Sequence, residues 1–206
     1  EYNSHMNESQ QVSDIVSAAH TEFNINKIYL DAYKQVSLGS GYAYPDATDA
    51  VNRGIQRGTL VVNYTGHGSS LQLAHESLIT ANRDILGWKN KNVMPIFVTA
   101  TCEFTEFDHI AKVSAGEDVI LNPNGGGIAL LTTTRVAYSN VNLDLNTNFN
   151  TANAFEKTVD GGARLGDVMK KTKNTNARNN SPSAKHFILL GDPSMRIAVP
   201  KYNVIT

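Results

Sequence analysis

Residues 60–69 read LVVNYTGHGS, a short apolar run that ends in a histidine flanked by two glycines. Residues 93–102 read VMPIFVTATC, a second apolar run that ends in the only cysteine of the chain. Continuous apolar runs of this length are typical of strands that are buried on both faces of a parallel sheet. The two runs therefore predict two strands of one sheet, and each strand ends in a chemically reactive side chain.

Other strands and helices alternate along the chain. We predict further strands at residues 25–30, 127–133 and 187–190, and helices at 7–22, 45–58, 114–121, 141–156 and 164–173. We interpret residues 33–44 as a surface loop and residues 77–87 as a mixed, partly helical segment. This alternation predicts an α/β fold with a mostly parallel sheet and helices on both of its faces.

The helix starts and stops carry local signals. Asn7 is the predicted N-cap of the first helix. Pro45 begins the second helix, and Gly58 ends it, as is typical of these two residue types.

Composition limits the classes of protein that fit. The chain has 206 residues, of which 41% are hydrophobic and 18% charged, so one domain with a real core is expected. The net charge of -1 gives no basic footprint for a nucleic acid, and no apolar stretch is long enough for a membrane span. A single cysteine excludes an intramolecular disulfide and a zinc site built on several cysteines.

His67 and Cys102 carry the candidate chemistry. In open α/β sheets, functional sites lie beyond the carboxyl ends of the strands, so these two side chains are expected at the same edge. A histidine activates a thiol toward carbonyl groups and supplies a proton to the leaving amine. Spacing alone leaves the alternative open that His67 is a structural residue of a glycine-rich turn and that Cys102 is a packing residue.

Several stretches together resemble the gingipain family of cysteine peptidases. Residues 62–69 resemble its histidine motif, and residues 98–108 resemble its cysteine motif. Further similar stretches lie at residues 114–117, 121–130, 132–135 and 189–196. Within the family, the Phe-x-x-Phe-Asp pattern at 104–108 and the Asn-x-His-Met pattern at 3–6 are most similar to the sortase branch that serves the type IX secretion system.

The resemblance implies a caspase-like α/β fold and a set of site residues. It implies that Cys102 is the nucleophile and that His67 is the general acid and base. The backbone amides of Gly68 and Cys102 would form the oxyanion hole, and Thr65 and Ala100 would line the primary specificity pocket. No cofactor is required for this chemistry. The six histidines show no metal-ligand spacing, and a structural calcium ion on oxygen ligands remains open.

As a sortase of this kind, the protein would cut the C-terminal targeting domain from secreted cargo through an acyl-enzyme on the cysteine. It would act at the outer surface of the cell with other components of the secretion system. Two alternatives are a plain secreted endopeptidase and a catalytically inactive interaction module. Gingipains that prefer basic residues carry an acid in the specificity pocket, and the uncharged Thr65 and Ala100 favour a sortase or a preference for small residues.

The resemblance also implies a strand before residue 1 that carries an acid to orient the histidine. We therefore expect residues 1–206 to be the catalytic domain of a longer protein, without its first strand and weakly active or inactive alone. Glu1 is a candidate for the orienting acid, and Glu76 and Asp108 are further acids near the motifs. Asp108 is expected to brace the loop behind the cysteine. We interpret His5, His75 and His109 as packing or solvated residues.

Overall fold

The computed structural model describes residues 3–39, 41–137, 139–151, 155, 162–178 and 185–199. The helices of this part of the chain are α1 (Ser4–Ala19), α2 (Pro45–Arg57), α3 (Ala115–Leu121), α4 (Ser139–Thr151) and α5 (Leu165–Arg178), with short 3-10 turns η1 (Leu30–Ala32) and η2 (Ile85–Gly87). The strands of the main sheet are β3 (Val61–Thr65), β6 (Ile96–Ala100), β7 (Ala129–Thr133) and β8 (Phe187–Leu190). Two small antiparallel pairs are β1 (Val36–Leu38) with β2 (Gly41–Ala43), and β4 (Gln72–Leu73) with β5 (Ile79–Thr80).

The main sheet has the strand order β3-β6-β7-β8. β6 runs parallel to both β3 and β7, and β8 is antiparallel to β7, so the sheet is mostly parallel as expected. Thr65 is paired with Ala100 at the carboxyl ends of β3 and β6. The two strands that precede the histidine and the cysteine are therefore neighbours and end at the same level.

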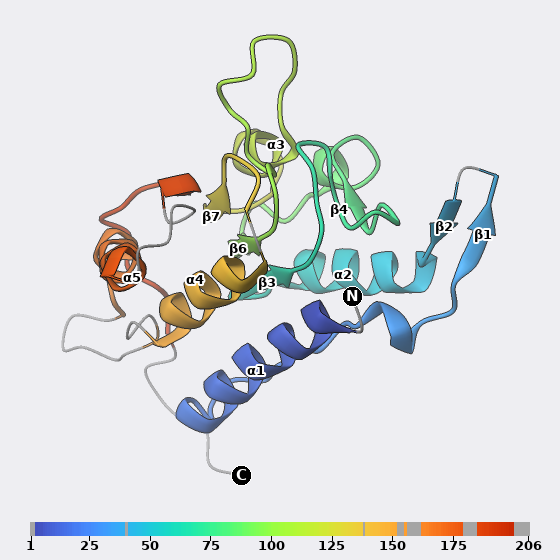
Figure 1. The fold of residues 1–206 in the computed structure, drawn as a ribbon. Helices are drawn as coiled ribbons and strands as arrows, with labels where there is room; N and C mark the ends of the chain where they lie inside the picture. The colour runs from blue at the N-terminus through green and yellow to red at the C-terminus, as the bar shows by residue number, and fades with distance from the viewer. Residues whose placement is uncertain are drawn as a thin grey trace.

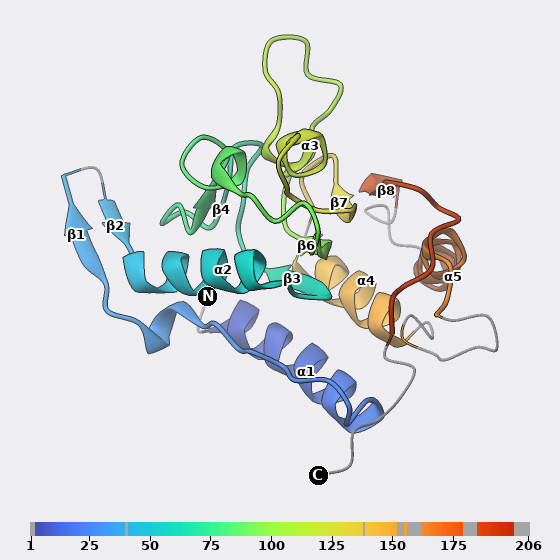
Figure 2. The ribbon, with the colours of Figure 1, turned by 180° about the vertical axis from the view of Figure 1, so that it is seen from behind.

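Helices cover both faces of the sheet (Figures 1 and 2). Alternate residues of β6 point to opposite faces, so Ile96, Val98 and Ala100 share one core cluster with Leu145 of α4 and other apolar side chains of α1, α4 and α5. On the other face, Phe97 lies in a second core cluster, which α2, α3 and residues 73–88 complete. The result is a three-layer α/β/α architecture of the caspase-like type.

Local sequence signals explain the helix boundaries. Pro45 occupies the first turn of α2, and Gly58 ends the helix with a φ of 97°, a value that glycine adopts without a steric penalty. Ser114 and Glu117 form a capping box at the start of α3, in which the Glu117 carboxylate accepts a hydrogen bond from the Ser114 amide at 2.8 Å. The prediction for α1 was wrong at its start, because Asn3 and not Asn7 precedes the helix.

Three segments differ from their predicted structure. Residues 25–30 are not a strand: residues 24–29 belong to no ladder, and Leu30 begins η1. The predicted loop at 33–44 contains the short pair β1 and β2. Residues 77–87 contain β5 and η2 and no α-helix. In each case the regular element has only two or three residues, which is too short for a periodic pattern.

The outer edge of β3 has no strand partner among the described residues. A groove of about 560 Å³ runs along this edge and is lined by α1, residues 22–29, α2 and β3. No helix within the described ranges is long and apolar enough to cross a membrane.

Candidate active site

His67 lies two residues beyond the end of β3, and a tight turn fixes its backbone. Its carbonyl oxygen accepts one hydrogen bond from the amide of Ala74 at 2.8 Å and another from the hydroxyl of Tyr64 at 2.6 Å. Burial raises the pKa of Tyr64 well above its usual range, so the phenol stays protonated as a donor. The backbone of His67 is therefore held from both sides.

Two other histidines contact the His67 ring. The ring of His75 stacks on it with a centroid distance of 4.5 Å and an interplanar angle of 10°. The ring of His5, from the first turn of α1, lies nearly perpendicular to it at 4.9 Å and 87°. His5 is itself held by a 3.1 Å contact between its Nδ1 and the carboxylate of Glu8, which is buried. These histidines are not part of a metal-binding group within the described part of the chain.

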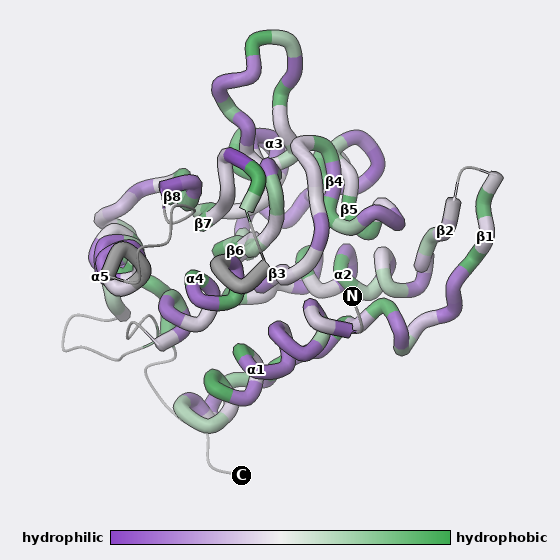
Figure 3. Tube along the Cα trace, viewed as in Figure 1, coloured by the Kyte–Doolittle hydropathy of each residue, from purple (hydrophilic) through white to green (hydrophobic). Residues whose placement is uncertain are grey.

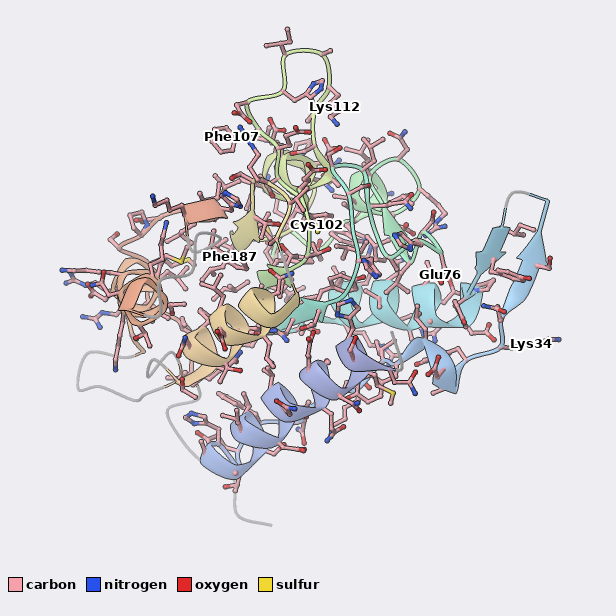
Figure 4. The ribbon with its side chains drawn as sticks, in the orientation of Figure 1. Lys34, Glu76, Cys102, Phe107, Lys112 and Phe187 are labelled. Atoms are coloured by element: carbon pink, nitrogen blue, oxygen red, sulfur yellow. The ribbon has the colours of Figure 1, made fainter. Side chains whose placement is uncertain are left out.

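Cys102 lies two residues beyond the end of β6 and is partly buried with a free thiol. Thr133 of β7 fixes the backbone just before it, because the Thr133 hydroxyl donates to the carbonyl of Thr101 at 2.6 Å. The next residue, Glu103, has a φ of 50°, an uncommon value for a side chain other than glycine. This sharp turn leaves Cys102 at the end of its strand, near the centre of the molecule in Figure 4.

The thiol of Cys102 donates a hydrogen bond to the backbone carbonyl of Ala137 at 3.3 Å. Ala137 lies in the segment after β7, so a third strand end contributes to the site. The thiol is therefore bonded to the segment after β7 in this structure.

The loops after β3 and β6 are in direct contact. A β-carbon added to Gly68 would lie 2.4 Å from the side-chain oxygen of Thr101, the residue before the cysteine. The Gly66 amide also donates to the Ala100 carbonyl at 3.3 Å, which continues the β3–β6 ladder toward the site. The histidine loop and the cysteine loop thus meet at one edge of the sheet.

Two backbone amides at this edge have no acceptor among the described residues. Gly68 forms an isolated antiparallel bridge with Leu73, in which the hydrogen bonds are made by the flanking residues, so its own N–H is directed away from Leu73. The amide of Cys102 likewise donates to no described residue. Both N–H groups belong to the two loops that meet.

A cavity of about 500 Å³ lies beside His67 and is lined by the start of α1, residues 28–31, the end of β3 and residues 74–76. Thr65 lines this cavity, and its hydroxyl accepts a hydrogen bond from Asn146 of α4 at 2.9 Å. Ala100 is fully buried in a core cluster instead and does not line the cavity. Glu76 lines the same cavity, whereas Glu1 is outside the described residues.

The segment after Cys102 forms a loop that projects from the molecule, with Phe107 and Lys112 on it (Figure 4). Asp108 binds the guanidinium of Arg135 through two hydrogen bonds, so Asp108 does brace this loop. Lys112 adds a 2.7 Å hydrogen bond to Ser70. The tip is hydrophobic in Figure 3, and Ile110 is fully exposed there.

Sequence reasoning missed some of these contacts. The roles of His5 and His75 against the His67 ring were not predicted, because ring contacts depend on how distant turns fold. Asn146 also lacked any signal, since it lies far along the chain from Thr65 and packs against it only through α4. His109 is exposed, and the amide of Ala111 donates to its ring at 3.2 Å.

The fold and the two strand-end loops define a class: an α/β domain of the caspase-like type, with a histidine and a cysteine at one sheet edge. The chain belongs to peptidase family C25, the gingipain family of cysteine peptidases, whose family model matches residues 1–198. No curated protein sequence matches it significantly.

Solved structures support the fold. The complex of the pro- and mature domains of RgpB from Porphyromonas gingivalis is similar with a TM-score of 0.71 and 15% identity, over 92% of this chain and 43% of that one. The Arg-specific cysteine proteinase gingipain R (RgpB) is similar with a TM-score of 0.70 and 18% identity, over 93% of this chain and 42% of that one. A structure described only as a protease is similar with a TM-score of 0.60 and 20% identity, over 74% of this chain and 39% of that one. The chain thus spans less than half the length of these similar proteins.

Proposed function

We propose that this protein is a cysteine endopeptidase in which Cys102 and His67 act as a catalytic pair. The observation that carries the proposal is the register of β3 and β6: Thr65 pairs with Ala100, and each reactive residue follows its paired residue by two positions. The contact between Gly68 and Thr101 supports it, because it brings the two loops together beyond the strand ends.

The proposed chemistry is acyl transfer. His67 takes the proton of the Cys102 thiol, and the thiolate attacks the carbonyl carbon of the scissile peptide bond. The amides of Gly68 and Cys102 stabilise the oxyanion that forms, and one such donor is typically worth about 3 kcal/mol. His67 then gives its proton to the leaving amine, and a thioester on Cys102 remains. These steps use only side chains and amides of the chain and need no cofactor.

The Cys102 thiol exchanges one partner for another in the proposed reaction. It leaves the hydrogen bond to the Ala137 carbonyl and transfers its proton to His67. A substrate carbonyl seated at the amides of Gly68 and Cys102 would then place the reacting carbon beside the sulfur.

We further propose that the thioester is passed to an amine, so that the protein is a sortase similar to PorU of the type IX secretion system. The motifs at 104–108 and 3–6 support this branch of the family. The substrate would be the C-terminal targeting domain of an exported cargo protein, and the site of action would be the outer surface of the cell, beside other secretion components. Thr65 is a small, uncharged residue in the cavity beside His67, but the carboxylates Asp31 and Glu76 line the same cavity, so a plain endopeptidase with a preference for basic residues stays the alternative.

A product analysis separates the two enzyme types. The protein is incubated with a peptide that carries a cargo targeting sequence, with and without glycylglycine as the amine acceptor. Mass spectrometry that finds the aminolysis product in excess of the acid supports the sortase. Acid alone, even at high acceptor concentration, supports a plain endopeptidase.

The inactive interaction module gives a third result. In that case neither product forms, and the wild-type protein and a Cys102→Ala variant behave alike. Cleavage by the wild-type protein together with its loss in Cys102→Ala excludes the module.

A further inference from the structure

The contact between His75 and His67 is not explained by packing of the core. His75 is exposed, so its ring is not in place to bury apolar surface. It nevertheless stacks flat on the proposed catalytic ring with a centroid distance of 4.5 Å. A side chain that is free to extend into solvent is instead folded back on the reactive histidine.

The turn that carries His75 has an unusual backbone on both sides. Ala74 has a φ of 63° and Ser77 a φ of 52°, which is the left-handed region that residues with a β-carbon rarely adopt. Strain of this kind persists only where the surroundings enforce it, and it concentrates at functional sites. Two such residues flank His75 within four positions, so contacts with the surroundings must hold the turn in this shape.

Side-chain hydrogen bonds enforce this shape. The side-chain amide nitrogen of Gln72 donates to the carbonyl of Ala74 at 3.0 Å. The side-chain oxygen of Gln72 accepts a hydrogen bond from the Ser77 hydroxyl at 2.9 Å. Arg83 donates to the Ser77 carbonyl at 2.7 Å. The turn is therefore rigid where it presents the ring of His75.

The same turn is also fixed to the backbone of His67. The Ala74 amide donates to the His67 carbonyl at 2.8 Å, and His75 follows directly. The backbone and the ring of His67 are thus held by neighbouring residues of one turn. His5 stands at nearly a right angle to the same ring and limits its movement from another direction.

We propose that His75 is a positioning residue that holds the imidazole of His67 in the orientation needed for proton transfer to and from Cys102. This inference rests on the proposed catalytic pair. A catalytic imidazole on a single side-chain bond to Cβ can rotate, and a flat ring against one face restricts that rotation. Offset or parallel stacking of two rings supplies this restraint without a chemical role for the second ring.

The test compares His75→Ala, His75→Phe and a control, His109→Ala, in which an exposed histidine of the projecting loop is removed. For each protein kcat and KM are measured with the targeting peptide, and the alkylation rate of Cys102 by iodoacetamide is measured in parallel. We expect His75→Ala to lower kcat by roughly fivefold to tenfold with KM unchanged. We expect His75→Phe to keep most of kcat, because a phenyl ring can stack, and His109→Ala to match the wild type.

Several results would overturn the inference. An unchanged kcat in His75→Ala would do so, as would equal losses in His75→Phe and His75→Ala, because stacking would then not be the cause. A change confined to KM would show that His75 contacts the substrate instead. A wild-type protein with neither hydrolysis nor fast alkylation would overturn the proposed function itself, and this inference with it. Thermal melting of each variant checks that the comparison is made between folded proteins.

Discussion

The backbone of Gly68 lies so close to the side chain of Thr101 that a β-carbon at position 68 would be 2.4 Å from the Thr101 oxygen. Gly68 follows the proposed catalytic histidine, and Thr101 precedes the proposed nucleophile. The contact therefore joins the two halves of the site, and only a residue without a side chain permits it.

Substitution of Gly68 by alanine should force the two loops apart. Thr101 is fully buried and has little room to move, so we expect a loss of about 1–3 kcal/mol in the free energy of unfolding. We expect kcat/KM to fall by at least about tenfold, since the proposed amide donor at position 68 is displaced as well. Gly87→Ala is the matched control, because a β-carbon there meets nothing within 4 Å. Equal activity and stability in the two variants would contradict the expectation.

Tyr64→Phe should test how firmly the backbone of His67 is held. The buried hydroxyl donates to the His67 carbonyl at 2.6 Å, so its removal should cost about 1 kcal/mol and lower kcat. Because burial raises the pKa of Tyr64, its contribution to stability is complete below pH 10 and decreases as the pH rises beyond that. Denaturant unfolding between pH 8 and about 11 should therefore show a steeper alkaline loss for the wild type than for Tyr64→Phe. The exposed Tyr42→Phe should leave the wild-type curve unchanged.

Asp84 should stabilise the segment that carries the His75 turn. Burial alone would raise the pKa of its carboxyl, but hydrogen bonds from Arg83, Thr80 and Asn52 outweigh burial and hold that pKa below its ordinary value. The stabilisation is therefore complete above about pH 4 and is lost as the pH falls through the lowered pKa. Asp84→Asn should be about 1–2 kcal/mol less stable than the wild type at pH 7, with a smaller difference near pH 3.

Urea unfolding of Asp84→Asn at both pH values checks this expectation. The control is Asp49→Asn, on the exposed side of α2. A stability difference that does not depend on pH would show that the carboxylate charge is not what stabilises the segment.

The free edge of β3 should be visible in hydrogen exchange. β3 pairs with β6 alone within the described chain, whereas β6 is paired on both sides. Outward-facing amides of β3 should exchange roughly a hundredfold faster than those of β6, because no carbonyl opposes them. Equal protection along both strands would show that another segment pairs with this edge.

The sequence predicted the parts of the fold that depend on local pattern. The continuous apolar runs before Thr65 and Ala100 identified β3 and β6, and Pro45 and Gly58 marked the ends of α2. The strand prediction for residues 25–30 was wrong, because a segment with Ile25 and Ile28 has the pattern of a strand but has no strand to pair with. Strand formation depends on a partner, which a local pattern does not contain.

The candidate site divides in the same way. His67 and Cys102 were identified from sequence because each follows a strand and carries reactive chemistry. The contacts of His75 with His67 and of Asn146 with Thr65 were not identified, because a strained turn and a distant helix create them. Contacts of this kind depend on tertiary structure, so the local sequence pattern does not predict them.

The rate at which iodoacetamide alkylates Cys102 near pH 6 tests the central claim most directly, with His67→Ala beside the wild type. A thiol that has transferred its proton to His67 should react at least about tenfold faster than a free cysteine, whose thiolate is scarce at this pH. His67→Ala should reduce that rate to the value of a free cysteine while the protein remains folded. Equal rates in the wild type and His67→Ala would contradict the account, because Cys102 and His67 would then not act as a pair.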